Sequence, residues 1–218
     1  MKVNVTYLFD PLCGWCYGAS PAIKKLSELS DISLTPIPTG MFADGARRID
    51  AAFASYAWSN DMRIEKLTGQ KFTDDYRVNV LGKVGSTFDS SAMTLALSAV
   101  KLTQPDRLLQ ALIAFQEARY VQGINTSEIE QANRLLLELG LSRAADLIAS
   151  QDKELLELNT AQVTKAQNLM RALGIQGVPA LVVTDLGVSK ALDGRLLFEN
   201  FEELIVQLHK FKAKISSN

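Results

Sequence analysis

The sequence predicts an α/β protein with a β-α-β beginning, an α-β-β-α end and a large all-helical insertion between them. Residues 3–38 read as strand, helix and strand, and residues 152–211 read as helix, two short strands and helix. Helical spacing of apolar residues dominates the stretch between them. We therefore expect residues 1–40 and 155–218 to form one domain, and residues 41–154 to form a helical insertion domain.

The N-terminal β-α-β unit is the clearest part of the pattern. Residues 3–9 alternate and are rich in Val, Tyr and Phe, as is typical of a strand. An Asp-Pro pair ends this strand, because proline cannot donate to a β-ladder. Residues 17–29 carry apolar side chains at helical spacing, with Pro21 expected to kink the helix. Residues 31–38 form a second strand, compatible with a right-handed parallel crossover.

The middle of the chain reads as helical as far as Gly140. Residues 90–102 form a strongly apolar helix, and Pro105 opens another that runs to about Val121. The part before residue 88 is rich in aromatic side chains, which form either core or the lining of a substrate groove, and we favour core: Phe42, Phe53, Tyr56, Trp58, Phe72 and Tyr76.

The C-terminal unit begins with a long helical pattern that Gly174 ends. Pro179 opens a strand, a position where proline is tolerated. An Asp-Leu-Gly turn then leads into a short strand over residues 187–192, which predicts an antiparallel hairpin. Asn200 is placed to cap the last helix.

Composition excludes several classes of function. The 218 residues are 47% hydrophobic and 22% charged, which is ordinary for a soluble globular protein. A net charge of −1 argues against nucleic-acid binding. No apolar run approaches the roughly 18 residues of a membrane span, and no secretory signal pattern opens the chain. Both cysteines lie in one motif, so we expect no structural disulfide and a cytoplasmic location.

The two cysteines lie in Leu12-Cys13-Gly14-Trp15-Cys16, at a strand-to-helix junction. A C-x-x-C in this position indicates a redox-active dithiol. Cys13 would lie at the helix N-terminus, where the helix dipole favours a thiolate, and Cys16 is one turn further on. A structural zinc site needs about four ligands. The single histidine, His209, is distant in sequence, so we expect no metal.

At this point the chain resembles the DsbA-like branch of the thioredoxin superfamily. The resemblance rests on the Asp10-to-Cys16 segment, on Pro21 inside the helix, and on Gly177-Val178-Pro179 before a late strand. It is similar above all to the predicted intracellular protein-disulfide isomerases, near the FrnE-like proteins and the kappa-class glutathione transferases. The resemblance implies a thioredoxin fold and thiol–disulfide exchange.

The resemblance also implies individual roles. Cys13 is then the attacking cysteine, Cys16 the resolving cysteine, and Pro179 a cis-proline that faces the dithiol. Gly14, Trp15 and Val178 would support substrate binding, with the backbone of Val178 pairing with an extended substrate. No bound cofactor is implied, and glutathione is a candidate electron donor. Protein or low-molecular-weight thiols and disulfides are the expected partners, with neither nucleic acid nor membrane.

Two positions depart from the pattern of thioredoxins and DsbA. A buried acid that assists proton transfer is replaced here by Tyr7, while nearby Asp10 is better placed to cap or turn the chain. The histidine that precedes the second cysteine in strongly oxidising DsbA proteins is replaced by Trp15. We therefore expect a less stabilised Cys13 thiolate and a weaker oxidant.

Two other functions stay open from the sequence. A glutathione-dependent kappa-type transferase or isomerase would carry one attacking hydroxyl residue at the position of Cys13 and no second cysteine, so the presence of Cys16 counts against it. A non-catalytic redox-sensing or peptide-binding module would use the groove near Pro179. The sequence leaves the oligomeric state and the natural substrate open.

Overall fold

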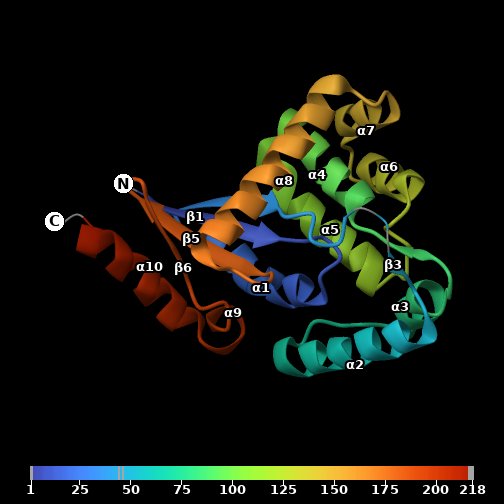
Figure 1. Cartoon of the computed structure of the whole chain (residues 1–218), viewed down its shortest axis with the longest axis horizontal. Coiled ribbons are helices and arrows are strands. Elements are labelled where there is room, and N and C mark those ends of the chain that lie inside the picture. The colour runs from blue at the N-terminus through green and yellow to red at the C-terminus, as the bar shows by residue number, and fades with distance from the viewer. Residues whose placement is uncertain (1, 44, 46, 216–218) are drawn as a thin grey trace.

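The two ends of the chain build one mixed sheet. The computed structural model (Figure 1) describes residues 2–43, 45 and 47–215. Its larger sheet has the strand order β2-β1-β5-β6. Strand β1 pairs parallel with β2 and antiparallel with β5, and β5 pairs antiparallel with β6. The bounds of the strands are β1 (Val3–Phe9), β2 (Ile32–Pro38), β5 (Ala180–Asp185) and β6 (Val188–Ala191). The predicted α/β class and the order of elements are confirmed.

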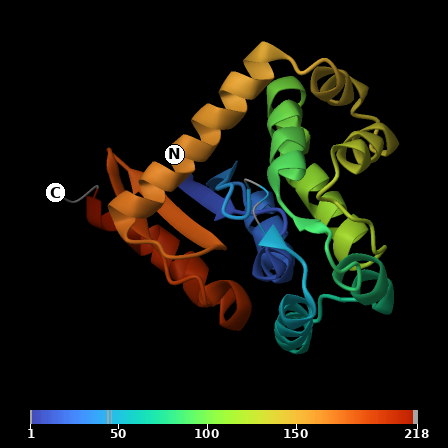
Figure 2. The ribbon, with the colours of Figure 1, turned by 45° about the vertical axis from the view of Figure 1, so that its right-hand side comes forward.

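Alternate side chains of this sheet face different helices, because successive residues of a strand point to opposite faces. Leu8 and Val182 pack with Ala166 and Met170 of α8 (Lys153–Leu173), the long helix that crosses the sheet in Figures 1 and 2. Tyr7, Phe9 and Leu181 belong to the opposite face. That face packs on α1 (Gly14–Glu28) and α10 (Phe201–Ile215) through Ile23, Leu26, Leu204 and Leu208.

Helix α1 starts at Gly14, three residues before the predicted start, so that Cys16 lies inside its first turn. The helix continues through Pro21, which leaves the carbonyl of Tyr17 without its usual helical donor. The side-chain amide of Gln70 donates to this carbonyl at 3.3 Å and to the Ser20 hydroxyl at 2.9 Å. A residue outside the helix thus makes proline tolerable here.

Residues 41–154 are mainly helical, as predicted, but the expectation of an all-helical insertion is wrong in one detail. Strand β3 (Arg47–Arg48) pairs antiparallel with β4 (Thr87–Phe88) in a two-stranded sheet. This small ladder closes the loop that contains helix α2 (Ala51–Thr68). Hydrophobic periodicity did not reveal the ladder. That residues 41–154 form a separate domain stays a prediction. The helical elements are α2 (Ala51–Thr68), α3 (Asp74–Tyr76), the π-helix η1 (Arg77–Leu81), α4 (Ser91–Thr103), the 3-10 helix η2 (Pro105–Arg107), α5 (Leu108–Tyr120), α6 (Ile129–Glu138) and α7 (Ser142–Ala149).

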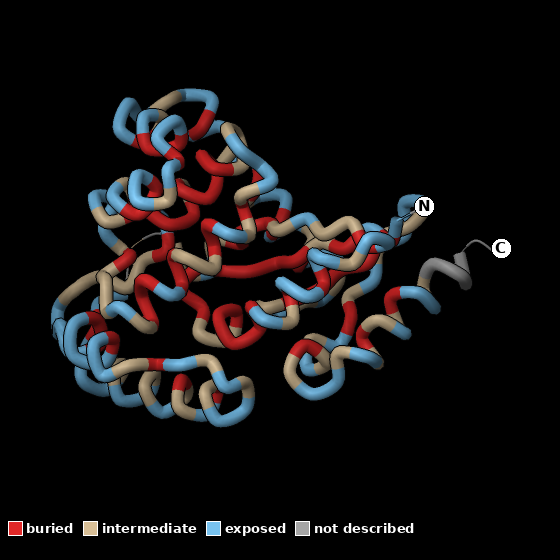
Figure 3. The backbone as a smooth tube through the Cα atoms, turned by 180° about the vertical axis from the view of Figure 1, so that it is seen from behind, coloured by how far each residue is buried: buried red, intermediate tan, exposed pale blue. Residues whose placement is uncertain are grey.

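Burial is concentrated where the helical part meets the sheet (Figure 3). Helix α4 is buried over most of its length and belongs to the same apolar cluster as the sheet face on α1. The preference for core is confirmed for Phe72 and Tyr76, which are buried against Tyr120. It is wrong for Tyr56, whose side chain is 72% exposed.

The C-terminal unit has the predicted hairpin. Leu186 and Gly187 form its turn with positive φ angles of 46° and 80°. Asn200 accepts the backbone N–H of Glu203 at 3.0 Å and so caps α10 as expected. A short helix, α9 (Leu196–Glu199), precedes it and was not predicted. Across the described ranges, no helix combines the length and the apolar character that crossing a bilayer requires.

Candidate active site

Cys13 lies at the N-cap of α1, immediately before the first helical residue. Its backbone N–H donates to the Asp10 carbonyl at 3.1 Å, and its carbonyl accepts the N–H of Tyr17 at 3.0 Å. The unpaired N–H groups at a helix N-terminus favour a nearby anion. A sulfur in this position is therefore suited to react as a thiolate.

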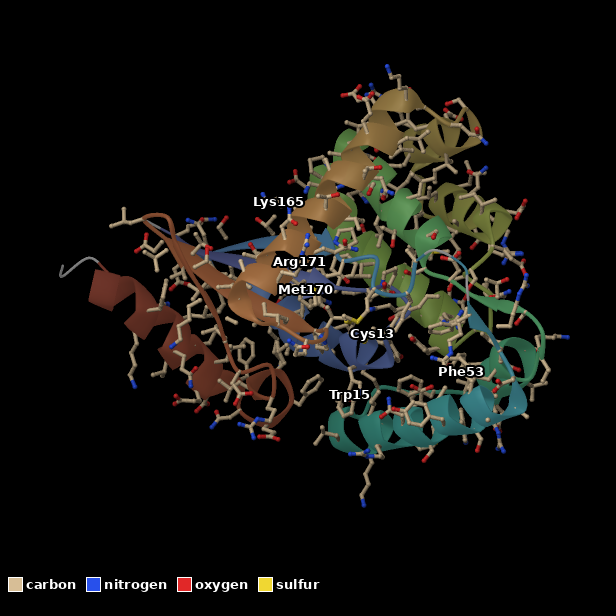
Figure 4. The ribbon with its side chains drawn as sticks, in the orientation of Figure 1. Cys13, Trp15, Phe53, Lys165, Met170 and Arg171 are labelled. Carbon is tan, nitrogen blue, oxygen red and sulfur yellow. The ribbon has the colours of Figure 1, made fainter. Side chains whose placement is uncertain are left out.

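The loop before β5 meets Cys13 from the far end of the sequence. The Cys13 thiol donates to the carbonyl of Val178 at 3.5 Å. The Val178–Pro179 peptide bond is cis, as the resemblance implied. These contacts bring the predicted Cys13-to-Cys16 motif and the predicted Val178-Pro179 pair together. Figure 4 shows Cys13 between helix α2, which carries Phe53, and the C-terminal part of α8, which carries Met170 and Arg171.

The two cysteines differ in their access to solvent. Cys13 is 7% exposed, whereas Cys16 is fully buried. Both are free thiols in this structure. Burial raises the pKa of Cys16 well above its usual value, its hydrogen bond and charge interaction with Cys13 raise it further, and the backbone of Asp10 lowers it in part. Cys16 is thus held as a protonated thiol behind Cys13.

Asp10 anchors the loop that carries the motif. Its side chain is completely buried. One carboxylate oxygen accepts the N–H of Leu12 at 2.9 Å, and the other accepts the N–H of Phe42 at 3.0 Å and the hydroxyl of Ser90 at 2.8 Å. Burial raises the pKa of Asp10, and these three donors lower it in part. The prediction that Asp10 turns the chain is confirmed, and it also ties the loop to the helical part.

The two departures from the family pattern are visible in the structure. Tyr7 is buried, and its hydroxyl donates to the carbonyl of Cys16 at 3.5 Å. Burial and the neighbouring cysteines raise the pKa of Tyr7, so it is no acid at neutral pH. Trp15 packs edge-on against Phe198 with ring centroids 5.3 Å apart, and it offers Cys13 no charged partner.

Sequence reasoning missed a cluster of polar groups on the other side of the motif. Asp61 of α2 lies against Gly14, and the hydroxyl of Tyr120 donates to the carbonyl of Leu12 at 2.8 Å. Tyr76 donates to Asp61 at 3.0 Å. These residues come from α2, α3 and α5, and no spacing in the sequence relates them to the cysteines.

A groove lies beside the loop that leads to Val178. Its volume is about 640 Å³. Its lining includes Thr39, Met41, Gln167, Met170, Arg171 and Gln176. Among the residues that the structure describes, no group of three or more His, Cys, Asp and Glu side chains is arranged to hold a metal ion.

Comparison with known proteins gives a consistent result. The DSBA-like thioredoxin domain family matches residues 4–206. The cytosolic disulfide reductase DsbM from Pseudomonas aeruginosa is 31% identical, with a TM-score of 0.82, and the match covers 94% of this chain and 98% of that one. The same reductase with GSH (glutathione) matches with a TM-score of 0.78 and 31% identity, over 94% of this chain and 99% of that one.

A more distant structure shares the fold. A candidate protein disulfide isomerase from Nitrosomonas europaea is 23% identical, with a TM-score of 0.76, over 96% of this chain and all of that one. No curated protein matches the chain significantly.

Proposed function

This chain belongs to the DSBA-like thioredoxin domain family and is a thiol–disulfide oxidoreductase, and we propose that Cys13 is its attacking cysteine and Cys16 its resolving cysteine. The observation that carries this assignment is the difference between the two sulfurs. Cys13 is at the helix N-terminus and 7% exposed, whereas Cys16 is fully buried with a raised pKa.

The proposed reaction proceeds in two exchanges. The Cys13 thiolate attacks one sulfur of a substrate disulfide, that S–S bond breaks, and the leaving sulfur takes a proton. Cys16 then loses its proton and attacks the Cys13 sulfur, which releases the second substrate thiol. The substrate gains two electrons and two protons, and the enzyme keeps a Cys13–Cys16 disulfide.

Supporting roles follow for the residues around Cys13. We assign Val178 and Pro179 to substrate binding, because the carbonyl of Val178 already contacts the Cys13 sulfur and Gln176 of the same loop lines the groove. An extended substrate would pair with the backbone of Val178. Gly14 lets the helix start in close contact with α2, and Trp15, which lies between the two cysteines, packs against Phe198 of α9.

We further propose glutathione as the electron donor and the cytoplasm as the location. The support is the reductase that is 31% identical, which is described as cytosolic and was also solved with GSH. Two glutathione molecules would reduce the Cys13–Cys16 disulfide, one forming a mixed disulfide on Cys13 and the other releasing it as oxidised glutathione.

Cysteine variants test the order of attack. The Cys16→Ser protein, incubated with a disulfide-bonded peptide, should accumulate a mixed disulfide on Cys13 that mass spectrometry detects. Cys13→Ser should form no adduct and catalyse no exchange. Adducts on Cys16 instead would reverse the assignment. Stoichiometric conjugation of glutathione to an electrophile, without disulfide exchange, would favour a kappa-type transferase.

A further inference from the structure

A buried carboxylate from the helical part lies directly against the first residue of the active-site helix. Asp61 is 4% exposed. A Cβ atom placed on Gly14 would be 2.6 Å from Oδ1 of Asp61 and 3.2 Å from Cδ1 of Ile64. Only glycine therefore allows α1 to start this close to the carboxylate. Gly14 is the residue that follows Cys13, so Asp61 and the Cys13 sulfur share one helix N-terminus.

The groups around Asp61 stabilise its ionised carboxylate only in part. Tyr76 donates to Oδ2 at 3.0 Å, and within the described part of the chain no other hydrogen bond or ion pair to Asp61 is present. Burial raises the pKa of Asp61 to about 7, although the hydrogen bond from Tyr76 and the positive charge of Arg119 lower it. Arg119 is itself 1% exposed, and among the described residues its Nε and Nη2 have no hydrogen-bond partner.

Tyr120 lies near both this carboxylate and Cys13. Its hydroxyl donates to the carbonyl of Leu12, next to Cys13, at 2.8 Å. Burial raises the pKa of Tyr120 well above its usual value, and the charges of Tyr76, Asp61 and Cys13 all raise it further while Arg119 lowers it. The groups that titrate or carry charge around Asp61 are thus Tyr76 from α3, Arg119 and Tyr120 from α5, and Cys13 at the start of α1.

We propose that Asp61 is a positioning residue that controls how stable the Cys13 thiolate is, because the two anions compete for the same helix N-terminus. This inference rests on the proposed role of Cys13. When Asp61 is ionised, the thiolate is less stable, the dithiol form of the enzyme is disfavoured and the disulfide becomes a weaker oxidant. When Asp61 is protonated, Cys13 ionises more readily.

Tyr7 stands where thioredoxins and DsbA have a buried acid. Here Asp61 supplies an acid near the dithiol from another part of the fold. The acid comes from α2, in the helical part, and approaches the start of α1 instead of the buried Cys16. It also favours a reductase, because a less stable thiolate makes the reduced enzyme a better electron donor.

The Asp61→Asn variant tests this proposal in two measurements on the full chain. The first is the rate of Cys13 alkylation by iodoacetamide as a function of pH. The second is the equilibrium between the dithiol and disulfide forms in glutathione buffers. We expect the alkylation midpoint to fall by about one pH unit, because removing a nearby negative charge favours the thiolate. At pH values above both midpoints, where Cys13 is ionised in both proteins, the dithiol should be favoured about tenfold, which is about 30 mV for two electrons.

Two further variants make the test specific. Asp106→Asn removes an exposed carboxylate from η2 and should leave both measurements unchanged. Tyr76→Phe keeps the carboxylate but removes its hydrogen-bond donor. It should behave like Asp61→Asn at neutral pH, where Asp61 is then protonated, and like wild type at about pH 9, where Asp61 is ionised. A purely structural role of Asp61 would not make the effect of Tyr76→Phe disappear between neutral pH and about pH 9.

The outcomes separate this inference from the proposed function. If wild type shows a dithiol couple that depends on Cys13, but Asp61→Asn matches it in alkylation profile and equilibrium, Asp61 has no such role. If Asp61→Asn does not fold, the Tyr76→Phe variant tests the proposal by itself. If the difference between Tyr76→Phe and wild type is the same at neutral pH and at about pH 9, the proposal is wrong. If wild type forms no Cys13–Cys16 disulfide in any glutathione buffer, the proposed function itself is wrong.

Discussion

Replacing Asp61 with asparagine should stabilise the folded protein at neutral pH, because the amide keeps an acceptor for Tyr76 and carries no charge. Burial raises the pKa of Asp61 from 3.8 to about 7, a rise of about three units. Each unit corresponds to about 1.4 kcal/mol, so ionised Asp61 lowers the free energy of unfolding by up to about 4 kcal/mol. The side chain is 4% exposed, so solvent screening reduces this figure little.

The sign of the pH dependence follows from proton binding. Because the pKa of Asp61 is higher in the folded state, the folded protein holds this proton more tightly than the unfolded chain. The stability contributed by Asp61 is therefore present at about pH 4 and is lost as the pH rises to about 7. Asparagine does not titrate, so the gap in stability between the variant and wild type should grow over that interval, from about zero to as much as 4 kcal/mol.

Urea unfolding of the reduced proteins, followed by circular dichroism at several pH values, measures this gap. Contributions from titrating groups that do not interact with Asp61 cancel in the difference between variant and wild type. The Asp106→Asn control should show no comparable growth, since Asp106 is exposed. An Asp61→Asn protein less stable than wild type at about pH 8, or a gap that does not change with pH, would refute the reasoning.

Three further substitutions test the packing around the motif, each by urea unfolding against wild type. Asp10→Ala leaves three donors without their acceptor and should lower the free energy of unfolding by about 3 kcal/mol; a change below about 1 kcal/mol would contradict its anchoring role. Gly14→Ala forces the carboxylate of Asp61 away from α1 and should cost about 1–2 kcal/mol, and wild-type stability would show that the contact yields freely. Gln70→Ala removes the donor to the Tyr17 carbonyl and should cost about 1 kcal/mol, whereas no loss would mean that water replaces the amide.

Much of the fold could be predicted because local patterns and tertiary structure agree at the two ends of the chain. The strand at residues 3–9 was predicted with its observed bounds, since its alternating side chains face two packed layers. The hairpin after Pro179 followed from an Asp-Leu-Gly turn whose residues adopt the required positive φ angles. The cis geometry of Pro179 was implied by the family resemblance alone, because nothing local to the sequence distinguishes it from a trans proline.

The remaining features depend on contacts between residues far apart in sequence. Helix α1 starts at Gly14 and not Tyr17, and its first residue packs on Asp61, a contact that hydrophobic periodicity cannot detect. The short ladder between β3 and β4 consists of two residues a side, too few to produce an alternating pattern. Asp61 lies in a helix with many polar residues, and only the folded chain distinguishes this buried carboxylate from the exposed ones.

The most direct test of the central claim is a redox titration of the purified protein in glutathione buffers, with rapid thiol trapping and mass analysis. Wild type should pass through a single transition in which Cys13 and Cys16 change state together, and Cys13→Ser should abolish it. Failure to form an intramolecular disulfide at any ratio of reduced to oxidised glutathione would contradict the account.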